Sequence, residues 1–142
     1  MKQIKIFTLI ISLSIIASIT NAQSFKVPPY EKFKLPNGLT IYLMEQHDVP
    51  VINVSAVLPA GAIYDGDKAG LASLTATALK HGTKNFSKSK LDEALDFIGA
   101  SVNTYASKES SGLSAKFASK DKEEVLAIIK DLLMEPVFDQ SE

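Results

Sequence analysis

Cysteine and arginine are both absent from this sequence of 142 residues, and its fifteen basic residues are all lysine. Without cysteine the chain has no disulfide, no lipid-modified thiol and no thiol chemistry, so its fold must rest on packing. Without arginine it lacks the planar guanidinium fork that best binds phosphates and base edges. These two absences argue against a disulfide scaffold and against a nucleic-acid-binding protein.

Histidine is scarce, since His47 and His81 are the only two. Neither lies four residues from a second histidine, so a mononuclear metal site would need both of them or mostly carboxylates. We interpret His47 as part of a polar loop at a strand end and His81 as a residue of a last helical turn, where positive charge is favourable. Asp65 and Asp67 lack the third ligand run and the closing glutamate of a calcium-binding EF-hand loop, which indicates an ordinary polar turn.

The sequence contains neither a Gly-x-Ser-x-Gly nucleophile elbow nor a glycine loop with the spacing that binds phosphates. Composition and motifs together therefore leave little support for serine hydrolase or nucleotide-dependent chemistry.

The first residues have the order of a secretory signal: a start containing Lys2 and Lys5, an apolar run over residues 6–19, and small residues up to Ala22. As a helix the apolar run would reach about 21 Å, against about 30 Å for a bilayer core. We predict a signal peptide over residues 1–22 that is cleaved near Ala22, with an uncleaved anchor as the alternative. The product, residues 23–142, would be periplasmic or secreted, with thirteen lysines facing sixteen acidic residues.

Alternating apolar residues predict the strands. Runs on either side of Pro36-Asn37-Gly38 predict a hairpin, because Asn-Gly between alternating runs is a strong hairpin signal. A third strand is expected over residues 51–58, and a second antiparallel pair over residues 101–107 and 112–118.

Helical spacing predicts three helices. The first begins with the pattern at Leu71 and ends before Gly82, the second ends at Gly99, and the third runs over about residues 121–134 until Pro136 stops it. The expected order is β-β-β-α-α-β-β-α. We predict an α+β fold in which helices pack on one face of a mixed or antiparallel sheet.

Several short segments, each weak alone, form a specific pattern in order and spacing over residues 29–142. They are Pro36-Asn37-Gly38-Leu39, Val49-Pro50, Ala60-Gly61, Ala69-Gly70-Leu71-Ala72, Gly82-Thr83 and Gly99-Ala100-Ser101-Val102-Asn103. In these segments the chain resembles the N-terminal domain of the M16 zinc peptidases, the pitrilysin and insulinase family that includes the mitochondrial processing peptidases. The resemblance, and an abrupt end at residue 142, imply the N-terminal part of an M16 peptidase-like domain that belongs to a longer chain.

The resemblance also implies that the catalytic site is lost. Active members carry His-x-x-Glu-His directly after Gly-Leu-Ala, with two zinc-binding histidines and a glutamate that polarises water. Here Ser73 and Thr77 stand at the histidine positions and Ala76 at the glutamate position. Neutral hydroxyls do not replace imidazole as tight zinc ligands. We therefore expect no metal site and no catalytic residue in this chain, with zinc confined to a catalytic partner or a later repeat.

By resemblance, Asn103, Thr104 and Tyr105 correspond to the strand beside bound peptide, with Asn103 the principal candidate. An alternative is that these side chains only alternate along a strand. The leading hypothesis is a non-catalytic M16 subunit or half that binds extended peptide and partners a catalytic zinc metallopeptidase. A second is the degenerate part of a longer M16 metalloendopeptidase with its zinc site in a later repeat. A third is a stand-alone peptide-binding or scaffold module.

Overall fold

The computed structural model describes residues 27–138, so the predicted signal peptide lies outside the described residues. The described residues divide between residues 46 and 47 into two compact units. The strands are β1 (Glu31–Lys34), β2 (Thr40–Leu43), β3 (Val51–Leu58), β4 (Ser101–Ala106) and β5 (Ser111–Ala118). The helices are α2 (Leu71–Ala78), α3 (Lys88–Ile98) and α4 (Lys122–Met134), with short 3-10 turns η1 (Ala62–Tyr64), η2 (Leu79–His81) and η3 (Ser119–Asp121).

In the first unit, β1 and β2 form the predicted antiparallel hairpin, in which Phe33 faces Ile41. Gly38 takes a φ of 92° in the turn, a conformation that side chains with a Cβ rarely adopt. The backbone N–H of Leu35 donates to the carbonyl of Leu39 at 2.8 Å and closes the loop. The expectation of a hairpin across Asn37-Gly38 is thus confirmed.

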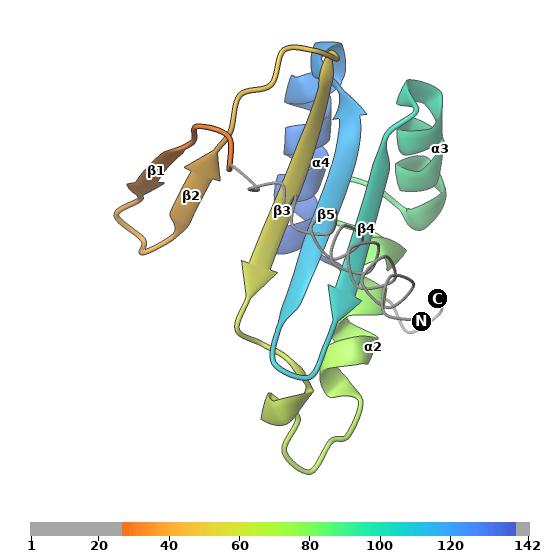
Figure 1. Ribbon diagram of the computed structural model, residues 1–142. Helices are drawn as coiled ribbons and strands as arrows, with labels where there is room; N and C mark the ends of the chain where they lie inside the picture. Colours follow the sequence, from red (N-terminus) through yellow and green to blue (C-terminus); the bar gives the residue numbers. More distant parts are fainter. Residues whose placement is uncertain (1–26, 139–142) are drawn as a thin grey trace, which may run out of the picture. The chain divides into compact units, whose positions relative to one another are not determined.

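In the second unit, three strands form an antiparallel sheet in the order β3-β5-β4, as Figure 1 shows. The central strand β5 pairs along its full length with β3, and six of its residues pair with β4. Within residues 27–138, β4 pairs with β5 alone and so forms one edge of this sheet. The 51–58 strand and the second antiparallel pair predicted from alternation are both present.

Helices α3 and α4 lie on one face of the sheet (Figure 1). The sheet contributes Val102, Leu113, Ala115 and Phe117 to the buried core, and the two helices contribute Leu91, Leu95, Val125, Ile128, Ile129 and Leu132. The α3 residues are four apart and the α4 residues recur at spacings of three and four, which is the pattern of a helix with one apolar face. The predicted α+β fold with helices packed on one face is confirmed.

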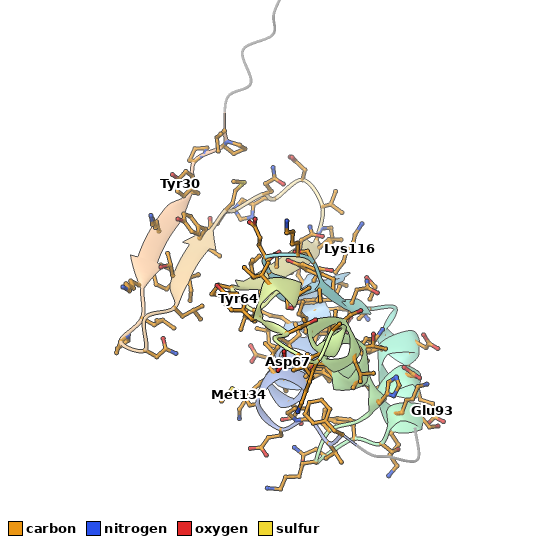
Figure 2. All side chains as sticks on the ribbon, turned by 90° about the horizontal axis from the view of Figure 1, so that it is seen from below. Tyr30, Tyr64, Asp67, Glu93, Lys116 and Met134 are labelled. Carbon is orange, nitrogen blue, oxygen red and sulfur yellow. The ribbon has the colours of Figure 1, made fainter. Side chains whose placement is uncertain are left out.

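The other face of the sheet is mainly polar. Lys116 of β5 lies opposite Asn53 of β3 and Ser101 of β4, and Ser114 faces Ser55 and Asn103 in the same way. Figure 2 shows Lys116 on the side of the sheet away from the helices. An apolar face on the core and a polar face outside is the common arrangement of antiparallel sheets.

Two glycines allow close backbone approaches next to α2. A Cβ at Gly112 would collide with the Ala56 carbonyl and the Tyr105 ring, and one at Gly61 would collide with the backbone of residues 108–110. The Gly61 approach lets the backbone N–H groups of Ala62 and Ile63 donate to carbonyls of the β4–β5 turn at 2.9 Å. The segment that leads into α2 is thereby attached to the sheet.

The boundary of one predicted helix differs from expectation. The helical pattern predicted one helix from Leu71 that ends before Gly82, but α2 ends at Ala78 and residues 79–81 form η2. A tighter last turn is common where a helix ends and its final carbonyls need other partners. Among residues 27–138, no helix is long and apolar enough to span a bilayer.

Candidate functional site

The start of α2 is fixed by one carboxylate. Asp65 accepts hydrogen bonds from the backbone N–H groups of Gly70 and Ala72, both at 2.8 Å. Gly70 is the N-cap residue of α2 and Ala72 lies in its first turn, where backbone donors have no intrahelical partner. A negative charge is also favourable at this end of a helix. Asp65 therefore holds the loop and the helix in one arrangement.

Replacing Asp65 with alanine is expected to lower the free energy of unfolding by about 1–3 kcal/mol, because two backbone donors lose a charged acceptor. Urea denaturation followed by circular dichroism measures this change. Asp67, exposed in the same loop, is the matched control, and its replacement by alanine should change stability by less than about 0.5 kcal/mol. Equal losses in the two variants would contradict the proposed role of Asp65.

The three positions that correspond to the catalytic motif have different environments on α2. Ser73 and Thr77 are exposed, whereas Ala76 is buried with 5% of its surface accessible. The Thr77 hydroxyl donates to the backbone carbonyl of Ser73 at 3.1 Å. A hydroxyl bonded back to its own helix in this way is directed toward that helix.

An apolar pocket of about 360 Å³ lies on one side of α2. Thr75, Ala76 and Leu79 line it from the helix side, and Leu58 and Tyr105 line it from the strands. Tyr105 packs over Gly112, which has no Cβ to block the ring. Tyr105 thus faces a mainly hydrophobic space, together with the residue at the former glutamate position.

A second pocket, which we call the polar pocket, has a volume of about 300 Å³. It is lined by Thr77 of α2, Lys80 and His81 of η2, Lys88 and Asp92 of α3, and Asn103 and Thr104 of β4. The structure therefore brings two of the three predicted peptide-binding residues, Asn103 and Thr104, beside a former ligand position. The third, Tyr105, lines the apolar pocket.

The loop between η2 and α3 brings the basic residues of the polar pocket together. Gly82 has a φ of 141° and forms an antiparallel bridge with Ser87. The buried Thr83 accepts the backbone N–H groups of Asn85 and Phe86 on its hydroxyl at 3.3 and 3.0 Å. This tight turn starts α3 directly beside the end of η2, which places Lys88 in the same pocket as Lys80.

Sequence patterns did not identify Lys80, Lys88 and Asp92 as pocket residues. Lys88 and Asp92 form an ion pair at 3.2 Å, and their spacing of four on a helix is a recognisable signal for such a pair. His81 lies at the end of η2, as expected of a last-turn histidine. That these residues would line a pocket with β4 depends on contacts between distant segments.

The residues of α2 do not fit a zinc ion. Ser73, Ala76 and Thr77 supply no imidazole and no carboxylate, and the Thr77 hydroxyl is bonded to the helix backbone. Within residues 27–138, no group of three or more histidine, aspartate or glutamate side chains is placed to hold a metal. The two pockets beside α2 are thus lined by apolar, hydroxyl and basic side chains.

Comparisons with known proteins agree with this geometry. The family described as insulinase (peptidase family M16) matches residues 40–142. The chain is 30% identical over 122 residues to mitochondrial-processing peptidase subunit beta of Saccharomyces cerevisiae, covering 83% of this chain and 26% of that protein. It is 28% identical over 125 residues to cytochrome b-c1 complex subunit 1 of Bos taurus, covering 87% and 26%.

The fold is also that of a solved M16 structure. The inactive domain of peptidase M16 from Pseudomonas fluorescens superposes with a TM-score of 0.75 at 20% identity, covering 79% of this chain and 28% of that chain. The chain thus has the fold of an M16 peptidase domain. The chain belongs to the insulinase family, peptidase family M16. It spans about a quarter of the length of the curated relatives it matches.

Proposed function

We propose that this chain is part of a non-catalytic M16 subunit or half that binds extended peptides and works with a catalytic zinc metallopeptidase. The observation that carries the proposal is which residues occupy the three motif positions on α2. The fold around the helix is retained, but the three motif positions hold Ser73, Ala76 and Thr77, and the Thr77 hydroxyl is bonded within the helix. Without a metal or a glutamate, neither water activation nor carbonyl polarisation is supplied.

Peptide binding is proposed along β4. An edge strand offers unpaired backbone groups to an added strand, and side-chain pockets beside it give specificity. β4 is an edge in the described part of the chain, and Asn103 and Thr104 line the polar pocket next to it. Tyr105 would contribute an aromatic contact from the neighbouring apolar pocket.

We propose a catalytic partner because relatives of this chain are subunits of larger assemblies. Two of them are subunits by name, one of a mitochondrial processing peptidase and one of the cytochrome b-c1 complex. We propose that the partner carries the intact His-x-x-Glu-His and the zinc, and that export by the predicted signal peptide places both in the periplasm or outside the cell.

A second candidate function is favoured by the small share of its relatives' length that this chain covers. Because the chain spans only 26% of its curated relatives, a longer protein can carry this stretch as a degenerate half and the zinc site in a later repeat. The sequence of such a longer chain distinguishes the two hypotheses by the presence or absence of His-x-x-Glu-His.

The purified exported protein is expected to hold far less than one zinc per chain and to cleave no peptide alone. Elemental analysis by mass spectrometry and a quenched fluorescent peptide library measure these two properties. Cleavage should appear when a co-purifying M16 subunit is added, and a chelator should then abolish it. Stoichiometric zinc together with cleavage by the lone chain would overturn the proposal.

A further inference from the structure

The polar pocket beside β4 has an uneven charge distribution. Its lining contains two lysines, Lys80 and Lys88, the imidazole of His81, and one acidic side chain, that of Asp92. Lys88 is already paired with Asp92 at 3.2 Å. Within residues 27–138, Lys80 and His81 form no ion pair.

The basic groups are partly removed from water. Lys80, His81 and Lys88 are all half-buried, and the side chain of Lys88 is 41% exposed. An opposite charge entering such a site gains more than it would at a fully exposed lysine, because screening by solvent is weaker there. The remaining lining residues are Thr77, Asn103 and Thr104. The Thr104 hydroxyl can donate a neutral hydrogen bond to an anion, whereas Asn103 also lines a pocket on the opposite face of the sheet, with Ser114 and Lys116.

We propose that the polar pocket binds a carboxylate of the peptide that lies along β4, so that this M16 chain selects acidic peptides. The inference rests on the proposed binding of an extended peptide at that edge. The pocket volume of about 300 Å³ is at the lower end of the range for small-ligand sites, which suits one side chain or one chain terminus. Lysine ammonium groups and carboxylates form charge-assisted hydrogen bonds that are stronger than neutral ones.

The experiment is fluorescence anisotropy of the 142-residue protein with labelled extended peptides at low and high salt. One pair of peptides differs by an internal glutamate or glutamine, and a second pair differs by a free or amidated C-terminus. At least one carboxylate form is expected to bind about tenfold tighter or more than its neutral counterpart. The preferred pair identifies the source of the carboxylate, and the preference should fall as salt increases.

Two variants test whether the pocket is responsible. Lys80→Gln is expected to remove most of the preference, and Lys80→Arg, which keeps the charge, should preserve it. Lys90→Gln is the matched control, since Lys90 is an exposed residue of α3 that does not line the pocket. Circular dichroism of each variant verifies that the fold is unchanged.

The outcomes separate this inference from the function on which it rests. Equal binding of acidic and neutral peptides would overturn the carboxylate pocket and leave peptide binding intact. A preference that survives Lys80→Gln, or that is lost in Lys90→Gln, would also overturn it. Binding of no peptide at all would overturn both the inference and the proposed peptide-binding function.

Discussion

A double substitution of Ser73 and Thr77 by histidine is expected to give α2 a zinc site and to make the stability of the protein depend on zinc. The two positions are four residues apart on one helix and both are exposed, so two imidazoles there would face the same way. Zinc bound only to the folded state raises the free energy of unfolding by about 2.7 kcal/mol at a hundredfold excess over the dissociation constant. Urea denaturation with and without zinc measures the change.

The matched control is the pair Ser73→His with Leu74→His, also on exposed positions of α2. Neighbouring residues on a helix point about 100° apart, so the two imidazoles cannot share one ion. Similar zinc stabilisation of both double variants, or of the unsubstituted protein, would contradict the assignment of residues 73 and 77 as the former ligand pair. The Ser73/Thr77 variant should still not cleave peptides, because Ala76 supplies no carboxylate.

Truncating Leu132 to alanine is expected to lower the free energy of unfolding by about 2–5 kcal/mol, the cost of a cavity in a packed core. Leu132 has no accessible surface and packs in the cluster between α4 and the sheet. This helix carries four of the ten residues of that cluster, so the loss should affect the whole second unit. Chemical denaturation measures the change.

Leu126 on the same helix is the control for this substitution. It is 42% exposed, and its replacement by alanine should shift stability by less than about 0.5 kcal/mol. A loss of comparable size at both positions would show that α4 does not bury the face assigned to it. A large effect at Leu132 alone would confirm the orientation of the helix against β5.

Most of the fold was predictable because its signals are local. The 51–58 strand alternates apolar and polar residues over residues 52–56, and α4 repeats Val125, Ile128, Ile129 and Leu132 at helical spacing. Both elements are found at or within one residue of their expected bounds. The end of the first helix was less accurate, since apolar spacing continues through η2 while the hydrogen-bond pattern changes.

The candidate site was predictable only in part. The substitutions at Ser73, Ala76 and Thr77 are visible in the sequence because the flanking segments with Gly70 and Gly82 fix the alignment of this stretch with the His-x-x-Glu-His motif. The division into two pockets is not visible there, and neither is the separation of Tyr105 from Asn103 and Thr104. Successive residues of a strand point to opposite faces, but which pocket each meets depends on where α2 ends against the sheet.

The sequence by itself determined the order of elements and the buried face of α4, since these depend on residue type and spacing along one segment. It did not determine the buried face of α2, where Leu71 and Leu74 are exposed and Ala76 is buried. Only the tertiary structure decided that Lys80, His81 and Lys88 line one pocket with Asn103. Those residues lie on η2, α3 and β4, and their meeting depends on the tight turn around Thr83 and on the packing of helices against the sheet. Distances between separate segments come from that packing, because local spacing carries no information about them.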